Sequence, residues 1–195
     1  MTVDVRPLTG DDLLAHLDGL ARLRIEVFRA FPYLYDGTMD YERRYLETYA
    51  RAPGSAIIGA FDGGELVGAA TGVPLAHEPD YATAPFRSAG LDVNQYFYFG
   101  ESVLRASYRG QGIGVKFFEA REAHARGLGL GVATFCAVER PVDHPRRPQG
   151  YEPLDAFWRR RGFAPMGLWG AFSWRDLDED DEREKPMVYW SKALR

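Results

Sequence analysis

The sequence predicts one mixed α/β domain that spans residues 1–195, and three observations support this fold class. A chain of 195 residues has the length of a single domain and can bury roughly 70% of its unfolded surface. Hydrophobic residues make up 46% of the sequence and charged residues 27%, as in globular proteins. Apolar runs of strand length alternate with segments of helical spacing, and we find neither an internal repeat nor a linker between domains.

In the first half of the chain, hydrophobic periodicity and turn residues define the elements. Thr9 and the acidic pair after it suit the start of a helix, which Pro32 would end. The sequence DGG at 62–64 separates two apolar runs and predicts a hairpin turn. The expected elements are a strand at 3–7, a helix at 11–31, an aromatic loop at 31–35, a helix at 40–51, and hairpin strands at 55–61 and 65–73.

The second half has a strand, a glycine turn and a helix as its central feature. A polar segment with prolines, residues 75–94, interrupts the sheet before this unit, and Gly162 marks the end of the last helix. The expected elements are strands at 95–104 and 130–138, a turn at 109–114, helices at 115–126 and 154–161, a basic loop at 139–153, and a hairpin of strands at 163–174 and 186–194 joined by an acidic connection at 176–184.

Charge and cysteine content exclude several classes of protein. A formal net charge of −4 disfavours a protein that binds nucleic acid, because such proteins are normally basic. The single Cys136 rules out an intrachain disulfide and any zinc site built from several cysteines, and the histidines lack metal-ligand spacing, so we expect no metal. The sequence has no secretory signal and no apolar run of about 20 residues, so we expect a cytoplasmic protein that does not bind membranes.

The sequence RGQGIG at residues 109–114 follows a predicted strand and opens a predicted helix. Backbone N–H groups at a helix start lack an intrahelical partner, and glycines let an anion approach them closely. The spacing excludes two nucleotide motifs, because a dinucleotide fold would need a third glycine at Val115 or Phe117, and a P-loop would need Gly-Lys-Ser/Thr. The turn is therefore a pyrophosphate site or an ordinary tight turn without a ligand.

This strand and turn resemble the acyl-CoA signature of the GNAT superfamily of N-acetyltransferases. The pattern Arg/Gln-x-x-Gly-x-Gly/Ala is matched by Arg109, Gly112 and Gly114. The order of the elements and the sequence LDAFWRRRGF at 154–163, which ends in Gly-Phe, extend the resemblance to most of the chain. The resemblance implies a single N-acetyltransferase domain with a mixed, mostly antiparallel central sheet flanked by helices.

The resemblance also implies acetyl-CoA as the co-substrate and direct attack of an amine on it in a ternary complex. Backbone amides of the turn would hold the pyrophosphate. The strand that contains Leu104 would splay from the strand near Val138, and its freed backbone groups would pair with the pantetheine. The expected cofactor-binding residues are Val103, Leu104, Arg109, Gly110, Gln111, Gly112, Ile113, Gly114 and Trp158.

Two catalytic positions are expected. An amine must be neutral to attack, and Glu101, an acid within an apolar strand, is the candidate base; burial would make it a better proton acceptor, with a water path as the alternative. Glu101 can also be an outward-facing partner in a surface ion pair, in which case Tyr98 is the alternative. Many family members have a tyrosine acid where this chain has Trp158, which cannot deliver a proton. Tyr151 or Cys136 can replace it, or the thiolate leaves unaided.

Aromatic residues define the expected acceptor side. The predicted substrate-binding residues are Phe31, Tyr33, Tyr35 and Tyr98. The stripe of Tyr41, Tyr45 and Tyr49 at helical spacing is interpreted as core. The segment at 75–94 can fold over the acceptor site or form a solvated insertion.

Two loops carry opposite charges. The basic loop with Arg140, Arg146 and Arg147 can meet the CoA 3′-phosphate, meet a carboxylate of the acceptor, or be solvated. The acidic connection is expected to be a solvated loop, so the net charge would average two opposed patches.

The favoured acceptor is a small-molecule amine, and a protein N-terminus or a lysine side chain is second. The rival from another class is a non-catalytic, regulatory module that binds acyl-CoA, which Trp158 in place of the usual tyrosine motivates. The sequence leaves a homodimer open, and it does not identify the acceptor or the length of the acyl chain.

Overall fold

The computed structural model describes residues 3–194. The strands in this range are β1 (Asp4–Pro7), β2 (Ala56–Asp62), β3 (Glu65–Pro74), β4 (Tyr96–Tyr98), β5 (Ser102–Leu104), β6 (Val132–Val138), β7 (Ala164–Trp174) and β8 (Arg183–Ala193). The α-helices are α1 (Gly10–Phe28), α2 (Met39–Arg51), α3 (Asp80–Ser88), α4 (Ile113–Gly127) and α5 (Asp155–Arg160). Short 3-10 turns are η1 (Leu75–His77), η2 (Val93–Gln95) and η3 (Ala106–Tyr108).

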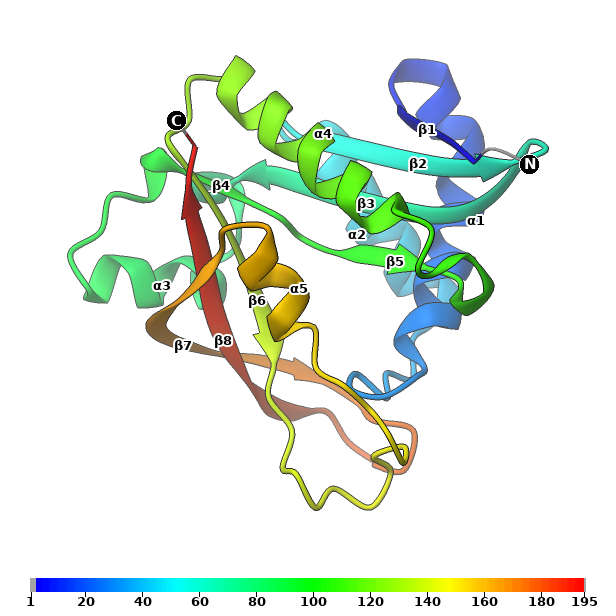
Figure 1. Ribbon diagram of the computed structural model, residues 1–195, viewed down its shortest axis with the longest axis vertical. Helices are drawn as coiled ribbons and strands as arrows, with labels where there is room; N and C mark the ends of the chain where they lie inside the picture. Colours follow the sequence, from blue (N-terminus) through cyan, green and yellow to red (C-terminus); the bar gives the residue numbers. More distant parts are fainter. Residues whose placement is uncertain (1–2, 195) are drawn as a thin grey trace.

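The eight strands form one sheet with helices on both faces (Figure 1). Seven strands pair in the order β1-β2-β3-β4-β6-β8-β7, and β5 pairs with β3 alone. The pairing of β4 with β6 is parallel, whereas the other pairings between these strands are antiparallel. The expected mixed, mostly antiparallel sheet with flanking helices is therefore confirmed.

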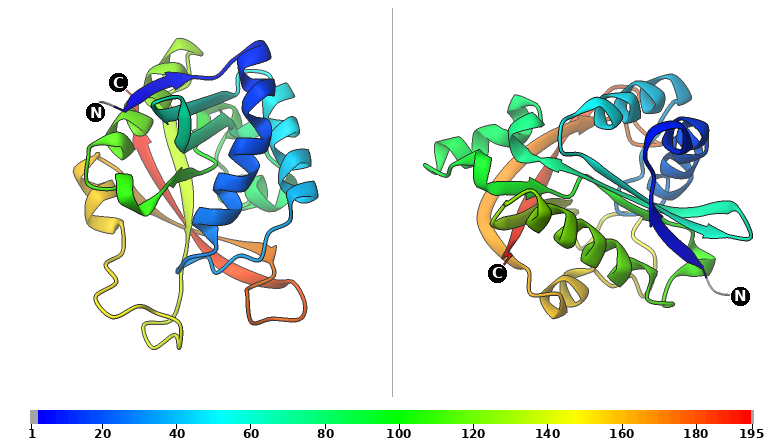
Figure 2. Two further views of the ribbon diagram at one scale, coloured as in Figure 1. Left: turned by 90° about the vertical axis from the view of Figure 1, so that its right-hand side faces the viewer. Right: turned by 90° about the horizontal axis from the view of Figure 1, so that it is seen from above.

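The two faces of the sheet differ in their covering helices and in their chemistry. Helices α1 and α2 cover one face, and α4 and α5 cover the other (Figure 2). Side chains alternate along β4, so Tyr98 joins the apolar cluster of α1 and α2, while Phe97 joins the cluster that packs against α4 and α5. Along β6, Cys136 joins the cluster of α1 and α2, and Phe135 joins the cluster that packs against α4 and α5.

Three predicted elements differ from the structure, the first helix, the segment at 75–94 and the strand at 95–104. The first helix ends at Phe28 rather than at residue 31, and the chain then turns through Leu34, which has a positive φ of 55°. The segment at 75–94 is not a solvated insertion, because it contains α3, whose Phe86 is fully buried against Tyr96 and Tyr189. The predicted polar interruption is thus a helix that extends the core.

The predicted strand at 95–104 is two short strands, and Arg121 of α4 fills the break between them. The Arg121 guanidinium is buried and donates to the carbonyl oxygens of Thr71 and Glu101, both at 3.0 Å, and to Ser102 Oγ at 2.7 Å. It also lies 4.1 Å from the centre of the Phe99 ring. Burial lowers the pKa of Arg121 to about 9. Its hydrogen bonds serve backbone groups at a point where the strand ladder is interrupted.

Gly100 lies within this break, and its size is required there. A Cβ atom at this position would lie 2.4 Å from the Tyr49 hydroxyl oxygen and 2.6 Å from Thr71 Oγ1. These separations are too short for any side chain, so the break brings the backbone into direct contact with α2.

No helix in residues 3–194 is both long enough and apolar enough to cross a bilayer.

We predict that Arg121→Met lowers the free energy of unfolding by on the order of 3 kcal/mol, because three buried or partly buried hydrogen bonds of its guanidinium, to Thr71, Glu101 and Ser102, are lost. Urea unfolding measures this change. Arg126→Met on the same helix removes an exposed guanidinium that pairs with Glu122 at 3.3 Å, and we expect a loss below about 0.5 kcal/mol. Equal losses for the two variants would contradict the role of Arg121.

Candidate functional site

Strands β5 and β6 separate and leave an opening in the sheet (Figure 1). Tyr98 of β4 pairs with Thr134 of β6, and the N–H of Phe99 donates to the Thr134 carbonyl oxygen at 2.8 Å. Beyond this point β5 pairs with β3, while β6 continues its pairing with β8. The edge of β5 that faces β6 is thus free to bind an extended ligand through its backbone.

The glycine turn at residues 109–114 lies next to this opening, at the start of α4. Gly110 and Gly112 have positive φ values of 75° and 80°, which glycine adopts without strain. A Cβ atom at either position would meet no heavy atom within 4 Å, so the turn faces open space. The first bonded amide of the helix belongs to Val115, which donates to the Gly112 carbonyl oxygen at 3.1 Å. The preceding amides form a cradle for an anion.

The predicted cofactor-binding residues divide between exposed and buried positions. Arg109, Gly110, Gln111 and Gly112 are exposed, so both their backbone and their side chains are accessible. The side chain of Ile113 is buried in an apolar cluster beneath the turn, which anchors the helix start and leaves only its amide for a ligand.

The other predicted cofactor-binding residues lie on elements that flank the opening. Val103 and Leu104 belong to β5, and the side chain of Val103 is fully buried. Trp158 of α5 packs against Phe135 and Trp190, with ring centroids 5.0 and 5.1 Å apart. The roles of these residues stay predictions.

Glu101 lies on the face covered by α1 and α2, within a buried cluster of charges. It is 8% exposed and forms an ion pair with Arg24 of α1, which also pairs with the buried Glu42 of α2. The hydroxyl of Tyr45 donates to Glu101 Oε2 at 2.9 Å. Burial alone would lower the pKa of Arg24, but Glu101, Tyr45 and Glu42 together raise it well above its ordinary value. Glu101 is therefore not in a surface ion pair, and one guanidinium serves two carboxylates.

A second carboxylate on this face, Glu78, has no cationic partner of this kind. Glu78 directly follows η1, and its carboxylate accepts a hydrogen bond from the Tyr49 hydroxyl. Burial raises the pKa of Glu78 to about 7; the hydrogen bond from Tyr49 opposes this rise, and the negative charge of Glu101 adds to it. Two neighbouring acids thus differ in environment, which is the usual way in which sites divide the roles of acid and base.

Tyr98 and Cys136 lie at the point where β4 and β6 part. The Tyr98 hydroxyl lies 3.0 Å from Cys136 Sγ, and both side chains are buried. Burial raises the pKa of the Cys136 thiol to about 12, so this thiol is not a ready proton donor at neutral pH. The predicted contact of Tyr98 with the acceptor stays a prediction.

The aromatic loop at 31–35 lies against the segment that carries Tyr151. The rings of Phe31 and Tyr151 are 4.7 Å apart. Burial raises the pKa of Tyr151, with opposing effects from Arg147 and Arg109, so its phenol stays protonated at neutral pH. The structure therefore brings the predicted acid close to one predicted acceptor residue, although neither role is tested.

The other two aromatic side chains of the loop differ in their surroundings. Burial raises the pKa of Tyr33, which lies within electrostatic reach of Cys136 and Glu101. Burial also raises the pKa of Tyr35, and Glu42 next to it adds to the rise. Tyr33 thus lies near the opening, and Tyr35 lies beside the Arg24 ion pairs.

The basic and acidic loops are not two opposed patches, because they bind each other. Arg140 pairs with Asp176 at 2.8 Å, and both side chains are buried. Arg140 also donates to the carbonyl oxygens of Pro32 and Tyr33, each at 2.8 Å. Arg140 therefore clamps the aromatic loop to the C-terminal hairpin, and its charge is neutralised before any phosphate or carboxylate could meet it.

Sequence reasoning missed Arg24, Glu42 and Glu78. The first two had a usable signal, because each interrupts the apolar stripe of its helix: Arg24 four residues after Leu20, and Glu42 four residues before Leu46. Glu78 had none, since it lies in the segment taken as a polar insertion. The interpretation of the tyrosine stripe as core is right for Tyr49 but wrong for Tyr41, which is 50% exposed.

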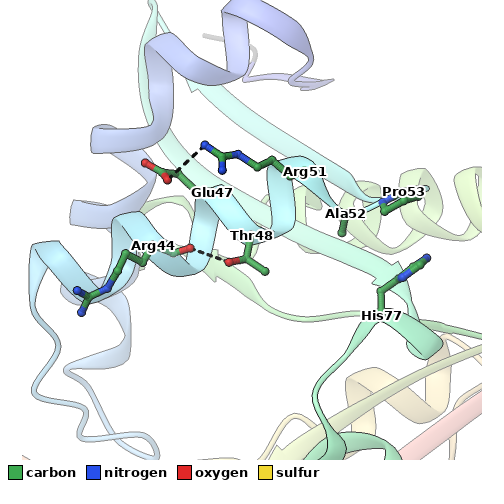
Figure 3. A pocket seen from close by; sticks show the side chains of 7 residues that line it. All are labelled: Arg44, Glu47, Thr48, Arg51, Ala52, Pro53 and His77. Carbon is green, nitrogen blue, oxygen red and sulfur yellow. Dashed lines mark hydrogen bonds and ion pairs between the residues drawn. The ribbon is translucent and has the colours of Figure 1, made fainter.

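A hollow on the outer side of α2 lies apart from these groups (Figure 3). Arg51 pairs with Glu47 at 3.7 Å, and Thr48 Oγ1 donates to the backbone carbonyl oxygen of Arg44 at 2.9 Å. Within residues 3–194, no group of three or more His, Cys, Asp or Glu side chains is arranged to hold a metal ion. We assign no ligand to the hollow.

In fold, the protein is of the class of N-acetyltransferases. Ribosomal-protein-alanine N-acetyltransferase from Brucella melitensis superposes with a TM-score of 0.64 at 18% identity, covering 98% of this chain and 99% of that one. An aminoglycoside 6′-N-acetyltransferase complexed with coenzyme A superposes with a TM-score of 0.63 at 15% identity, covering 100% of this chain and 98% of that one. The structure of yncA from Salmonella typhimurium with its cofactor acetyl-CoA superposes with a TM-score of 0.63 at 10% identity, covering 100% of this chain and 95% of that one.

The sequence defines the family. A family model described as "Acetyltransferase (GNAT) family" matches residues 20–163, so the chain belongs to the GNAT acetyltransferases. The match spans the second half of α1, all of α2, the break at Gly100 and the glycine turn. No curated protein matches the sequence significantly.

We predict that Glu78 makes the protein less stable as the pH rises. Its folded pKa of about 7 lies above the ordinary value of 4.5, so the folded state binds the extra proton between these values and loses about 3 kcal/mol of stability as the pH passes through them. Urea unfolding between pH 4.5 and 8 measures this slope, which Glu78→Gln should remove. Glu47→Gln, an exposed change on α2, should keep the wild-type slope. Parallel curves for wild type and Glu78→Gln would contradict the prediction.

Proposed function

We propose that the protein transfers an acetyl group from acetyl-CoA to an amine, with a compact small-molecule amine as the acceptor. One observation carries the proposal: an exposed turn with left-handed Gly110 and Gly112 begins α4 beside the opening between β5 and β6. This arrangement offers an anion cradle next to a free strand edge. A pyrophosphate joined to an extended amide chain matches both features.

The residues of the turn and of β5 have distinct roles in this proposal. Backbone amides from Gly110 to Gly114 hold the pyrophosphate, whereas the Arg109 N–H already donates to the Ala106 carbonyl oxygen at 3.2 Å and only its exposed side chain is available. Backbone groups of Val103 and Leu104 pair with the pantetheine. When bound, acetyl-CoA supplies an activated thioester. The protein contributes mainly by holding the amine against it, which replaces an encounter in solution by a fixed geometry.

The departing thiolate has two nearby aromatic side chains. Trp158 offers an indole N–H, which can donate a hydrogen bond but no proton. Tyr151 keeps its phenolic proton at neutral pH because burial raises its pKa. We assign Trp158 to contact with the cofactor and Tyr151 to proton donation, with unaided departure of the thiolate as the alternative.

The preference for a small acceptor is supported by the closure of the acceptor side. The clamp of Arg140 and Asp176 ties the aromatic loop to the C-terminal hairpin, and Trp174 Nε1 donates to the Tyr33 carbonyl oxygen at 3.0 Å. Because the aromatic loop is tied to the hairpin, less space is left for a protein that presents its N-terminus or a lysine side chain. The structural neighbours include a ribosomal-protein-alanine N-acetyltransferase and an aminoglycoside 6′-N-acetyltransferase, so the fold accommodates both classes of acceptor.

A panel of amines tests the proposal directly. We expect thiol release from acetyl-CoA with at least one amine among polyamines, amino acids, aminoglycosides and peptides, at a rate above hydrolysis. Binding of acetyl-CoA without thiol release from any amine would favour the non-catalytic module that Trp158 suggests. Absence of acetyl-CoA binding in calorimetry would overturn the proposal.

We predict that Gly112→Asp abolishes acetyl-CoA binding, because it adds a carboxylate and a strained Cβ where the pyrophosphate would bind. Gly129→Asp is the matched control, since Gly129 lies beyond the other end of α4 with a φ of 75° and an equally open surrounding. Both variants carry the same charge change and a strain of about 1–2 kcal/mol. Calorimetry should detect binding to the control alone. Loss of binding in both variants would contradict a role for the turn.

A further inference from the structure

The proposed acetyl transfer, on which this inference rests, needs a group that accepts a proton from the acceptor amine. An amine is protonated at neutral pH and must lose a proton before it attacks. The acceptor side contains two candidate carboxylates, Glu101 and Glu78, within electrostatic reach of each other. Their contacts differ, and the difference separates their roles.

Glu101 is held by a cation and a hydroxyl. Its carboxylate pairs with Arg24 and accepts a hydrogen bond from Tyr45 at 2.9 Å. The Arg24 guanidinium is buried, and Glu101 and Glu42 compensate its charge. Glu101 therefore has a structural partner that a catalytic base would have to give up.

Glu78 is held by one neutral donor. The Tyr49 hydroxyl donates to Glu78 Oε1 and fixes the direction of the carboxylate. Tyr49 is buried and touches the break between β4 and β5, since its hydroxyl would lie 2.4 Å from a Cβ atom at Gly100. Tyr49 therefore links Glu78 to the break between β4 and β5, and among residues 3–194 Glu78 forms no ion pair.

The other titratable groups that face Glu78 stay neutral around pH 7. Burial raises the pKa of each of these phenols and of the thiol, to about 12 for Tyr81 and Cys136. Besides Glu101, six titratable side chains lie around Glu78, on α2, α3, β4, β6 and β8. They are Tyr45, Tyr49, Tyr81, Tyr98, Cys136 and Tyr189. Glu78 is thus the member of this set whose charge changes near neutral pH.

We propose that Glu78 accepts the proton of the acceptor ammonium, that Tyr49 is its positioning residue, and that Glu101 and Glu42, which share the single cation Arg24, hold the ammonium side of the site negative.

The proposed step moves one proton of the nitrogen to Glu78 and a second to the departing sulfur. The Glu78 carboxylate takes one proton from the ammonium group and becomes a carboxylic acid, which leaves a neutral amine. The amine nitrogen forms a bond to the acetyl carbon, and the bond between that carbon and sulfur breaks with its electron pair on sulfur. The second proton of the nitrogen ends on the thiolate, through Tyr151 or solvent. Glu78 then returns its proton to solvent.

Kinetics with the amine that gives the most thiol release test the proposal. For wild type, kcat/KM should rise with pH to a plateau with a midpoint near 7, and Glu78→Gln should lower the plateau by about 100-fold and remove the rise. Tyr49→Phe should move the midpoint to higher pH, because it removes a hydrogen bond that stabilises the charged carboxylate of Glu78. Glu101→Gln should keep the rise with a lower midpoint, because a nearby negative charge is removed. Glu47→Gln on α2 is the control and should match wild type.

A second measurement does not need an acceptor. With ¹³C-labelled glutamate carboxyls, NMR should show one signal that titrates near pH 7 and disappears in Glu78→Gln. Titration of Glu78 below pH 5 would overturn the proposal, as would an unchanged pH–rate profile in Glu78→Gln. Loss of the rise in Glu101→Gln alone would assign the proton to Glu101. Each of these results leaves acetyl transfer intact, whereas failure to bind acetyl-CoA overturns acetyl transfer itself.

Discussion

The arrangement of the site depends on one buried interaction, the contact of the Arg121 guanidinium with the break between β4 and β5. At the break, Thr71 and the segment from Gly100 to Glu101 keep two backbone hydrogen bonds, from Thr71 N–H to the Glu101 carbonyl oxygen at 3.0 Å and from Gly100 N–H to the Thr71 carbonyl oxygen at 3.1 Å. Arg121 adds a second donor to both carbonyl oxygens, with Nη1 at 3.0 Å from each, and so ties the two sides of the break together. Because Arg121 belongs to α4, the same helix that begins at the glycine turn also fixes the position of Glu101. One side chain therefore couples the anion cradle to the acidic groups on the opposite face of the sheet.

The break also explains why the two faces carry different chemistry. On the side of α4 and α5, Phe99 and Phe118 stack against Arg121 and exclude water from the break. On the side of α1 and α2, Gly100 leaves room for the Tyr49 hydroxyl and hence for its contact with Glu78. The strand ladder is interrupted beyond this point, because β5 pairs with β3 and β6 pairs with β8. In the proposed function, the glycine turn and the acidic groups contribute to one reaction at this interruption.

The sequence could predict what local patterns determine, and it could not predict what distant pairs determine. The turn at Gly110 and Gly112 was predictable because left-handed backbone favours glycine and because a strand precedes it and a helix follows. The pairing of Arg140 with Asp176 was not, because the partners lie on separate loops and each resembles a solvated charge in its local sequence. Glu78 escaped prediction for a related reason, since its burial comes from α2 and the sheet rather than from its neighbours in sequence.

The acceptor side is held rigid by groups that take no part in chemistry, and this bears on specificity. Arg140 donates to the carbonyl oxygens of Pro32 and Tyr33, and Lys185 pairs with Glu179 at 2.6 Å beneath the same hairpin. A loop held by charge-assisted hydrogen bonds to its backbone keeps its position while its side chains can vary. Aromatic walls in fixed positions discriminate acceptors by shape, and the net negative charge of the groups around Arg24 discriminates by charge. For the proposed acetyl transfer, the clamp and the two carboxylates around Arg24 are consistent with a cationic amine as the acceptor.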